Sequence, residues 1–71
     1  MSQVPTNLSW ERVVRVLKRA GFELRHEGRH TSLSLGGRIV VIPRHPRIKR
    51  ETLRAIIKDS GLTIEEFKRL L

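Results

Sequence analysis

Residues 22–42 consist of three short segments separated by glycine turns, and this pattern constrains the fold more than any other feature of the chain. Apolar and polar side chains alternate with a period of two in FELRHE and in RHTSLSL, and the third segment, RIVVI, is rich in β-branched residues. Gly28 separates the first two segments, and Gly36-Gly37 is typical of a two-residue hairpin turn of the primed type. The pattern predicts a three-stranded antiparallel meander.

The alternation also assigns two of the histidines to faces of this sheet. In the first segment His26 shares the face of Phe22 and Leu24, so we expect it at the edge of the core. In the second segment His30 lies on the face opposite Leu33, so we expect its imidazole to face solvent or a ligand.

Helical periodicity flanks the sheet on both sides and predicts its cover. Residues 10–20 carry an apolar stripe that follows a capping residue, Ser9, and ends at Gly21. Residues 49–60, KRETLRAIIKDS, carry a second apolar stripe that ends at Gly61. Two helices with one apolar face each can cover one face of a three-stranded sheet.

The remaining segments complete the expected organisation. Thr63 and Glu66 have the spacing of a capping box, which predicts a short third helix. Residues 43–47, PRHPR, are expected to form a loop because proline removes donors from a strand ladder. Residues 1–8 are expected to form a flexible arm before a single domain over residues 9–71.

The fold class expected from this order, α-β-β-β-α-α, is a two-layer α+β domain with a three-stranded antiparallel sheet covered on one face by helices. The expected core combines helix and strand positions with one of the two alternating sets between Ile39 and Ile42. Its other members are Val13, Val14, Leu17, Leu33, Leu35, Leu53, Ile56 and Ile57.

Charge narrows the class of partner. The chain carries 15 Lys and Arg against 7 Asp and Glu, a net charge of +8, and most of the basic residues are arginine. Arginine recognises phosphate in a bidentate manner, and a basic surface of this kind is typical of nucleic-acid binding. An acidic protein partner is the other interpretation of the charge.

Several function classes are disfavoured by composition. The chain has no cysteine, and its histidines lack zinc-type spacing, so no metal site and no cofactor is expected. Seven acidic residues make a two-metal nuclease improbable. The first residues lack the pattern of a signal peptide, and no apolar run is long enough to span a bilayer. We expect a cytoplasmic protein without a membrane partner.

His30 is the candidate for chemistry. A histidine near neutral pKa can take a proton from a ribose 2′-OH or give one to a leaving 5′-oxygen. Gly28 offers backbone N–H groups in a turn, and Arg29 could stabilise charge on a phosphate in the transition state. The competing interpretation is that His30 is an ordinary polar residue of an exposed strand face.

The basic loop before the second helix is the candidate for binding. Arg44, His45 and Arg47 lie between and after two prolines, where a rigid loop could clamp a phosphate near the positive end of that helix. The competing interpretation is a turn fixed by proline, with its charges solvated.

Four motifs together resemble one family. They are Gly28-Arg29-His30, the sequence PRHP at 43–46, TLRAII at 52–57 and GLTIEEF at 61–67. In this order they are similar to the HicA toxin family, small mRNA interferases of toxin–antitoxin modules. The similarity extends from about Trp10 to Phe67.

The resemblance implies a fold like that of double-stranded-RNA-binding domains and a metal-independent endoribonuclease activity. It implies that His30 is catalytic, that the substrate is mRNA, and that a cognate HicB-type antitoxin covers the active site. Arg29 stands where the family usually has a serine, and Thr31 stands where a second histidine is frequent. The alternative is an RNA-binding module of the same fold without catalysis, which reads RNA shape and 2′-OH groups.

Overall fold

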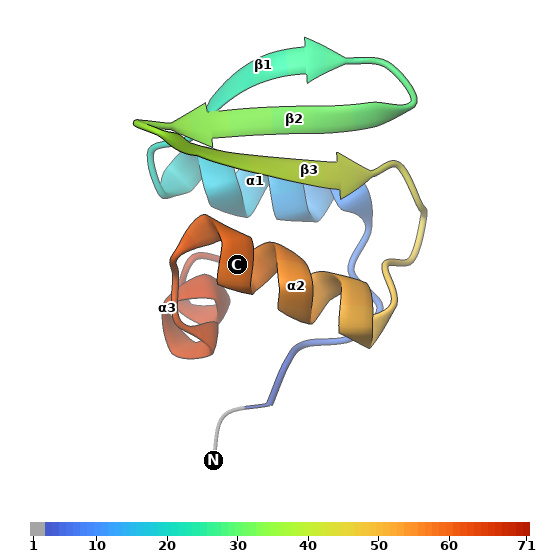
Figure 1. Ribbon diagram of the computed structural model, residues 1–71. Coiled ribbons are helices and arrows are strands. Elements are labelled where there is room, and N and C mark those ends of the chain that lie inside the picture. Colours follow the sequence, from blue (N-terminus) through green and yellow to red (C-terminus); the bar gives the residue numbers. More distant parts are fainter. Residues whose placement is uncertain (1–2) are drawn as a thin grey trace.

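The computed structural model describes residues 3–71 and has the expected element order, α-β-β-β-α-α (Figure 1). The strands form one antiparallel sheet in the order β1-β2-β3. The elements are α1 (Trp10–Arg19), β1 (Glu23–Glu27), β2 (His30–Leu35), β3 (Arg38–Pro43), α2 (Arg50–Ser60) and α3 (Ile64–Arg69). The predicted α+β fold class is therefore confirmed.

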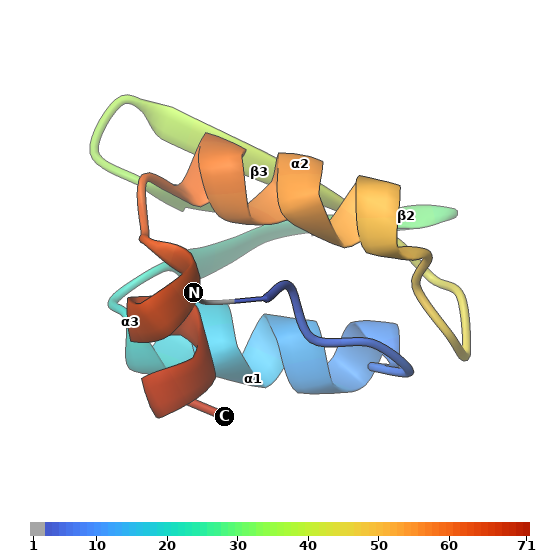
Figure 2. The same ribbon diagram turned by 90° about the horizontal axis from the view of Figure 1, so that it is seen from below.

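The helices lie on one face of the sheet and leave the other face open (Figure 1). Figure 2 shows α1 and α2 side by side and running in the same direction, with α3 across their carboxyl-terminal end. None of the helices within residues 3–71 has the length and apolar character that crossing a membrane requires.

The helix ends have the local chemistry that the sequence indicates. The Ser9 hydroxyl accepts a hydrogen bond from the Arg12 N–H at 3.3 Å and caps α1. Gly61 ends α2 in the left-handed conformation, with φ of 79°. Thr63 and Glu66 form the predicted capping box at the start of α3.

The two ends of β3 differ in how well the sequence predicts them. Leu35 pairs with Arg38 across the Gly36-Gly37 turn, and φ is positive at Gly36 alone, at 60°, as in a type II′ turn. At the other end β3 extends through Pro43, which was expected to belong to the loop. β3 is an edge strand, and no further strand pairs with its outer side. Proline, which lacks a backbone N–H, is tolerated in edge strands for this reason.

The core lies between the sheet and the helices and differs from the predicted set. Two predicted members are not buried, since Leu35 is 46% exposed and Val14 is half-buried. Six residues that were not predicted are buried, namely Val4, Leu8, Val16, Phe22, Ile48 and Phe67. Leu35 lies at the end of β2, beyond the helical cover. The buried core residues are Val4, Leu8, Val13, Val16, Leu17, Phe22, Leu33, Val40, Ile42, Ile48, Leu53, Ile56, Ile57 and Phe67.

The segment before α1 belongs to this core. Val4 and Leu8 are buried, and the Leu8 carbonyl accepts a hydrogen bond from the Ile48 N–H at 2.8 Å. Figure 2 shows the segment along the helices, on the side away from the sheet. The prediction of a flexible arm over residues 1–8 is thus wrong at Val4 and Leu8, because burial of apolar surface fixes them. Residues 1–2 lie outside the described part.

Candidate functional site at one end of the sheet

The fold brings both candidate segments to one end of the domain. The turn between β1 and β2 and the loop over residues 44–49 lie at the same end of the sheet (Figure 1). The pairing of His30 with Pro43 across β2 and β3 accounts for this, since the loop begins directly after Pro43. Residues 28–30 and residues 44–49, which are 14 or more positions apart in sequence, therefore lie together at one end of the sheet. We refer to this part of the domain as the corner.

His30 opens β2 and faces the uncovered side of the sheet. Thr31 and Leu33 belong to the other alternating set of β2, are 1% and 0% exposed, and point toward the helices. The imidazole of His30 is exposed, as the sequence predicts. This position leaves its ring nitrogens accessible to a ligand on the open face.

The turn that carries His30 is tight. The Gly28 N–H donates to the His30 carbonyl at 3.1 Å, and Arg29 is exposed at the tip. A Cβ atom at position 28 would lie 2.9 Å from Nε2 of His26, so the histidine ring approaches the glycine backbone closely. A side chain at position 28 would therefore displace the exposed His26 ring, and the φ angle of Gly28 does not itself require glycine.

His26 is not at the edge of the core, and this corrects the sequence-based expectation. Its side chain is exposed, and its strand partner is Ser32. The register of β1 shifts between Leu24 and His26, so a bulge breaks the strict alternation there. His26 therefore shares the open face with His30, whereas Leu24 keeps the face of its partner on the core side.

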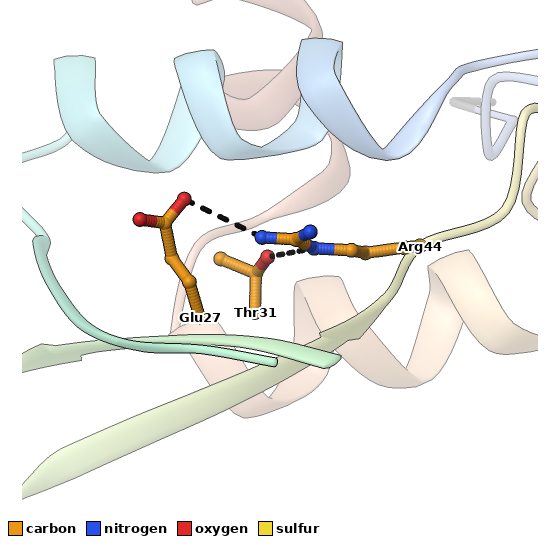
Figure 3. Close-up of polar contacts among 3 residues, drawn as sticks. All are labelled: Glu27, Thr31 and Arg44. Atoms are coloured by element: carbon orange, nitrogen blue, oxygen red, sulfur yellow. Dashed lines mark hydrogen bonds and ion pairs between the residues drawn. The ribbon is translucent and has the colours of Figure 1, made fainter. Parts of the chain in front are cut away.

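Arg44 occupies the opposite side of the sheet, in the space between the strands and α1 (Figure 3). Its Nε donates to the Thr31 Oγ1 at 3.1 Å, and Nη2 contacts the Glu27 carboxylate at 3.4 Å. Its Cζ lies 4.7 Å from the centroid of the Trp10 ring. The guanidinium is thus engaged by groups of the protein itself, and the Arg44 side chain remains 34% exposed.

The loop that contains His45 and Arg47 is fixed through its backbone. The His45 N–H donates to the Pro43 carbonyl at 2.9 Å, and the His45 carbonyl accepts from the Trp10 N–H at 3.1 Å. The side chains of His45 and Arg47 are exposed. The loop leads directly into α2 and touches the first residue of α1, so both helices begin at this end of the domain, on the covered side of the sheet (Figure 1).

The corner therefore combines an exposed imidazole with positive charge. Arg29 and Arg47 are exposed on the turn and on the loop. An imidazole can carry a proton, and arginine side chains can bind an anion. Within residues 3–71 no group of three His, Asp or Glu side chains is arranged as a metal site would require.

No sequence pattern indicated that Trp10, Glu27 and Thr31 belong to this corner. Alternation placed Thr31 on the covered face, but no local pattern relates residue 27 or 31 to residue 44. Only the strand register and the path of the loop bring these side chains together.

Comparison with known proteins agrees with the motifs. The model of a family described as the HicA toxin of bacterial toxin–antitoxin systems matches residues 10–62, from the first residue of α1 to just beyond α2. The match includes the whole sheet and the corner described above. A comparison with curated proteins found no match. The matched region is well over half of the chain, and the protein belongs to the HicA toxin family, whose members are the toxins of toxin–antitoxin pairs.

Proposed function

We propose that this toxin is an endoribonuclease of the mRNA interferase type, acting on messenger RNA in the cytoplasm by metal-independent acid–base chemistry at His30. The observation that carries the proposal is the position of His30. Its exposed imidazole opens β2 on the uncovered face, at the corner where Arg29 and Arg47 supply positive charge. Family membership and the net charge of +8 support RNA as the substrate.

The reaction moves two protons, because the 2′-OH loses one and the leaving 5′-oxygen gains one. The ribose 2′-oxygen forms a bond to phosphorus, and the bond from phosphorus to the 5′-oxygen breaks. His30 takes the proton of the 2′-OH as a general base, or gives a proton to the 5′-oxygen as a general acid, and water exchanges the other proton. The products would be a 2′,3′-cyclic phosphate and a 5′-hydroxyl.

The other residues of the corner bind the RNA backbone in this proposal. Arg29 and Arg47 contact phosphate oxygens, and Arg29 can stabilise the charge of the transition state. His45 contributes a phosphate contact from the fixed loop, and the Gly28 turn lets the backbone of the RNA approach. These contacts are electrostatic, so affinity should fall as salt rises.

The test is cleavage of a mixed messenger RNA in EDTA by the purified protein and by three alanine variants. His26, His30 and His45 are all exposed, so each replacement removes the same atoms at a small cost in stability. We expect His30→Ala to abolish cleavage with the circular dichroism spectrum unchanged. His45→Ala should weaken RNA binding more than the chemical step, and His26→Ala should retain cleavage.

Two results would contradict the proposal. Full cleavage by His30→Ala would remove this histidine from the mechanism, and products ending in a 5′-phosphate would indicate a different reaction. RNA binding without cleavage by any form of the protein would leave a binding module, and Arg29 would then be the first position to restore to serine.

We propose in addition that the antitoxin partner is of the HicB type and inhibits by covering His30. Family membership supports a cognate antitoxin, and the open face is accessible to one. Co-expression with the product of the adjacent reading frame should yield a complex that does not cleave RNA. A complex that still cleaves would show that the partner binds elsewhere.

A further inference from the structure

Arg44 is set apart from the other basic residues by what it contacts. Its pair with Glu27 is the one salt bridge within residues 3–71, although the chain has 15 Lys and Arg. Its guanidinium lies on the covered side of the sheet (Figure 3). The His30 imidazole faces the open side, because Thr31 and Leu33 of the other alternating set are buried. The Arg44 side chain is thus poorly positioned to bind a substrate that approaches His30.

We propose that Arg44 is a positioning residue, which fixes the β1–β2 turn from beneath and so holds the His30 imidazole in place relative to the His45 loop. For its effect on catalysis this inference rests on the proposed ribonuclease function. The contacts themselves, and their effect on the order of the turn, do not depend on that function.

The Arg44 guanidinium contacts both ends of the turn between β1 and β2. Glu27 ends β1 just before the turn, and Thr31 follows His30 in β2. Arg44 contacts both, at 3.4 Å and 3.1 Å. Across the turn itself the backbone provides the bond from the Gly28 N–H to the His30 carbonyl. The backbone ladder pairs Glu27 with Thr31, and loss of the guanidinium contacts would remove the side-chain link that supports this pair next to His30.

The same guanidinium connects the turn to the His45 loop and to α1. The Trp10 ring lies under its Cζ at 4.7 Å, within the range of a cation–π contact. The Trp10 N–H in turn binds the His45 carbonyl at 3.1 Å. Turn, loop and helix start thus form one connected corner, in which Arg44 is the shared side chain.

These contacts depend on the shape and donors of a guanidinium, and a positive charge alone would not make them. The Nε donor to Thr31 and the planar group over Trp10 are features of a guanidinium that an ammonium lacks. The acceptor, Thr31 Oγ1, offers a single hydroxyl on the covered face. Thr31 is 1% exposed, so it cannot contact RNA directly.

The experiment is a double-mutant cycle of Arg44→Lys and Thr31→Val. Each variant removes the Nε–Oγ1 hydrogen bond, and neither removes the positive charge or the side-chain volume. The readouts are kcat and KM on a short RNA that the parent protein cleaves, and the hydrogen exchange rate of the Gly28 amide by NMR. Thr52→Val, at a half-buried threonine of α2 outside the corner, is the matched control.

We expect each single variant to lower kcat by roughly 10- to 100-fold, as small displacements of a catalytic group do. KM should stay within about twofold of the parent value, and the Gly28 amide should exchange faster. The double variant should lose little more than the worse single variant, because both remove one interaction. The Thr52→Val control should match the parent in all three readouts.

Other results would overturn the inference. If Arg44 binds phosphate, Arg44→Lys should raise KM with kcat retained, and Thr31→Val should have no effect. Parent-like exchange at Gly28 in both variants would show that Arg44 does not order the turn. If the parent protein does not cleave RNA, the ribonuclease proposal fails, whereas faster Gly28 exchange in both variants would still support the positioning role.

Discussion

Phe67 lies beyond the residues matched by the family model, and its burial predicts that α3 is an integral part of the domain. Its side chain is 0% exposed and is the largest of the fully buried side chains. Replacing a fully buried phenylalanine by alanine costs about 3–5 kcal/mol, from lost apolar burial and from the cavity that remains. A domain of 71 residues is stable by roughly 4–11 kcal/mol, so Phe67→Ala should lose about a quarter or more of its stability.

Urea unfolding followed by far-ultraviolet circular dichroism measures this effect. With a slope of about 1 kcal/mol per molar, the midpoint should fall by about 3 M or more. Leu35→Ala is the control, since that leucine is 46% exposed and should change the midpoint little. If Phe67→Ala is unfolded in water, Phe67→Leu should fold with a smaller loss. A change below about 1 kcal/mol for Phe67→Ala would refute the reasoning and place α3 outside the cooperative unit.

Two further predictions concern the ends of the helices. Gly61→Ala should destabilise the protein by about 1–3 kcal/mol in the same urea assay, because φ is 79° there and the new Cβ would lie 2.9 Å from the Arg38 guanidinium. Gly37→Ala is the control, because open space surrounds Gly37 and the change should be close to neutral. Equal effects of the two variants would contradict the role of the positive φ at Gly61. The backbone hydrogen bond from Thr63, and then the Thr63 side chain, lower the pKa of Glu66 from its ordinary value of 4.5. A lowered pKa stabilises the fold above the unfolded-state pKa, and this contribution is lost as the pH falls through the folded-state pKa. Glu66→Gln should therefore remove part of the acid dependence of the urea midpoint, and an unchanged dependence would contradict the prediction.

The acid–base proposal and the positioning proposal make different demands on the same corner. His30 must be accessible, and it lies on the open face. Its supports must be rigid, and they lie on the covered face, where Thr31 is buried. The strand alternation provides both, because consecutive residues of β2 point to opposite faces of the sheet.

Local chemistry made much of the fold predictable. Ser9, Gly61 and the pair Thr63 and Glu66 act within one helical turn, so their capping roles follow from sequence spacing alone. The Gly36-Gly37 turn and the alternation around Leu33 fixed the β2–β3 hairpin in the same way. The exposure of His30 followed from that alternation.

Other features required the assembled structure. The bulge in β1 moves His26 to the open face, and no residue type at positions 24–26 predicts a bulge there. Val4 and Leu8 are fixed only because the helical layer offers apolar surface to a segment without a pattern of its own.

The sequence by itself determined the element order, the caps, the turns and the exposed histidine at the start of β2, because each depends on residues a few positions apart. Tertiary structure alone decided that the turn at residues 28–29 and the loop at 44–49 share a corner. It also decided that Arg44 contacts Glu27, 17 positions away in sequence, Thr31, 13 positions away, and the ring of Trp10. Contacts of that range depend on strand register and chain path, which only the packed fold specifies.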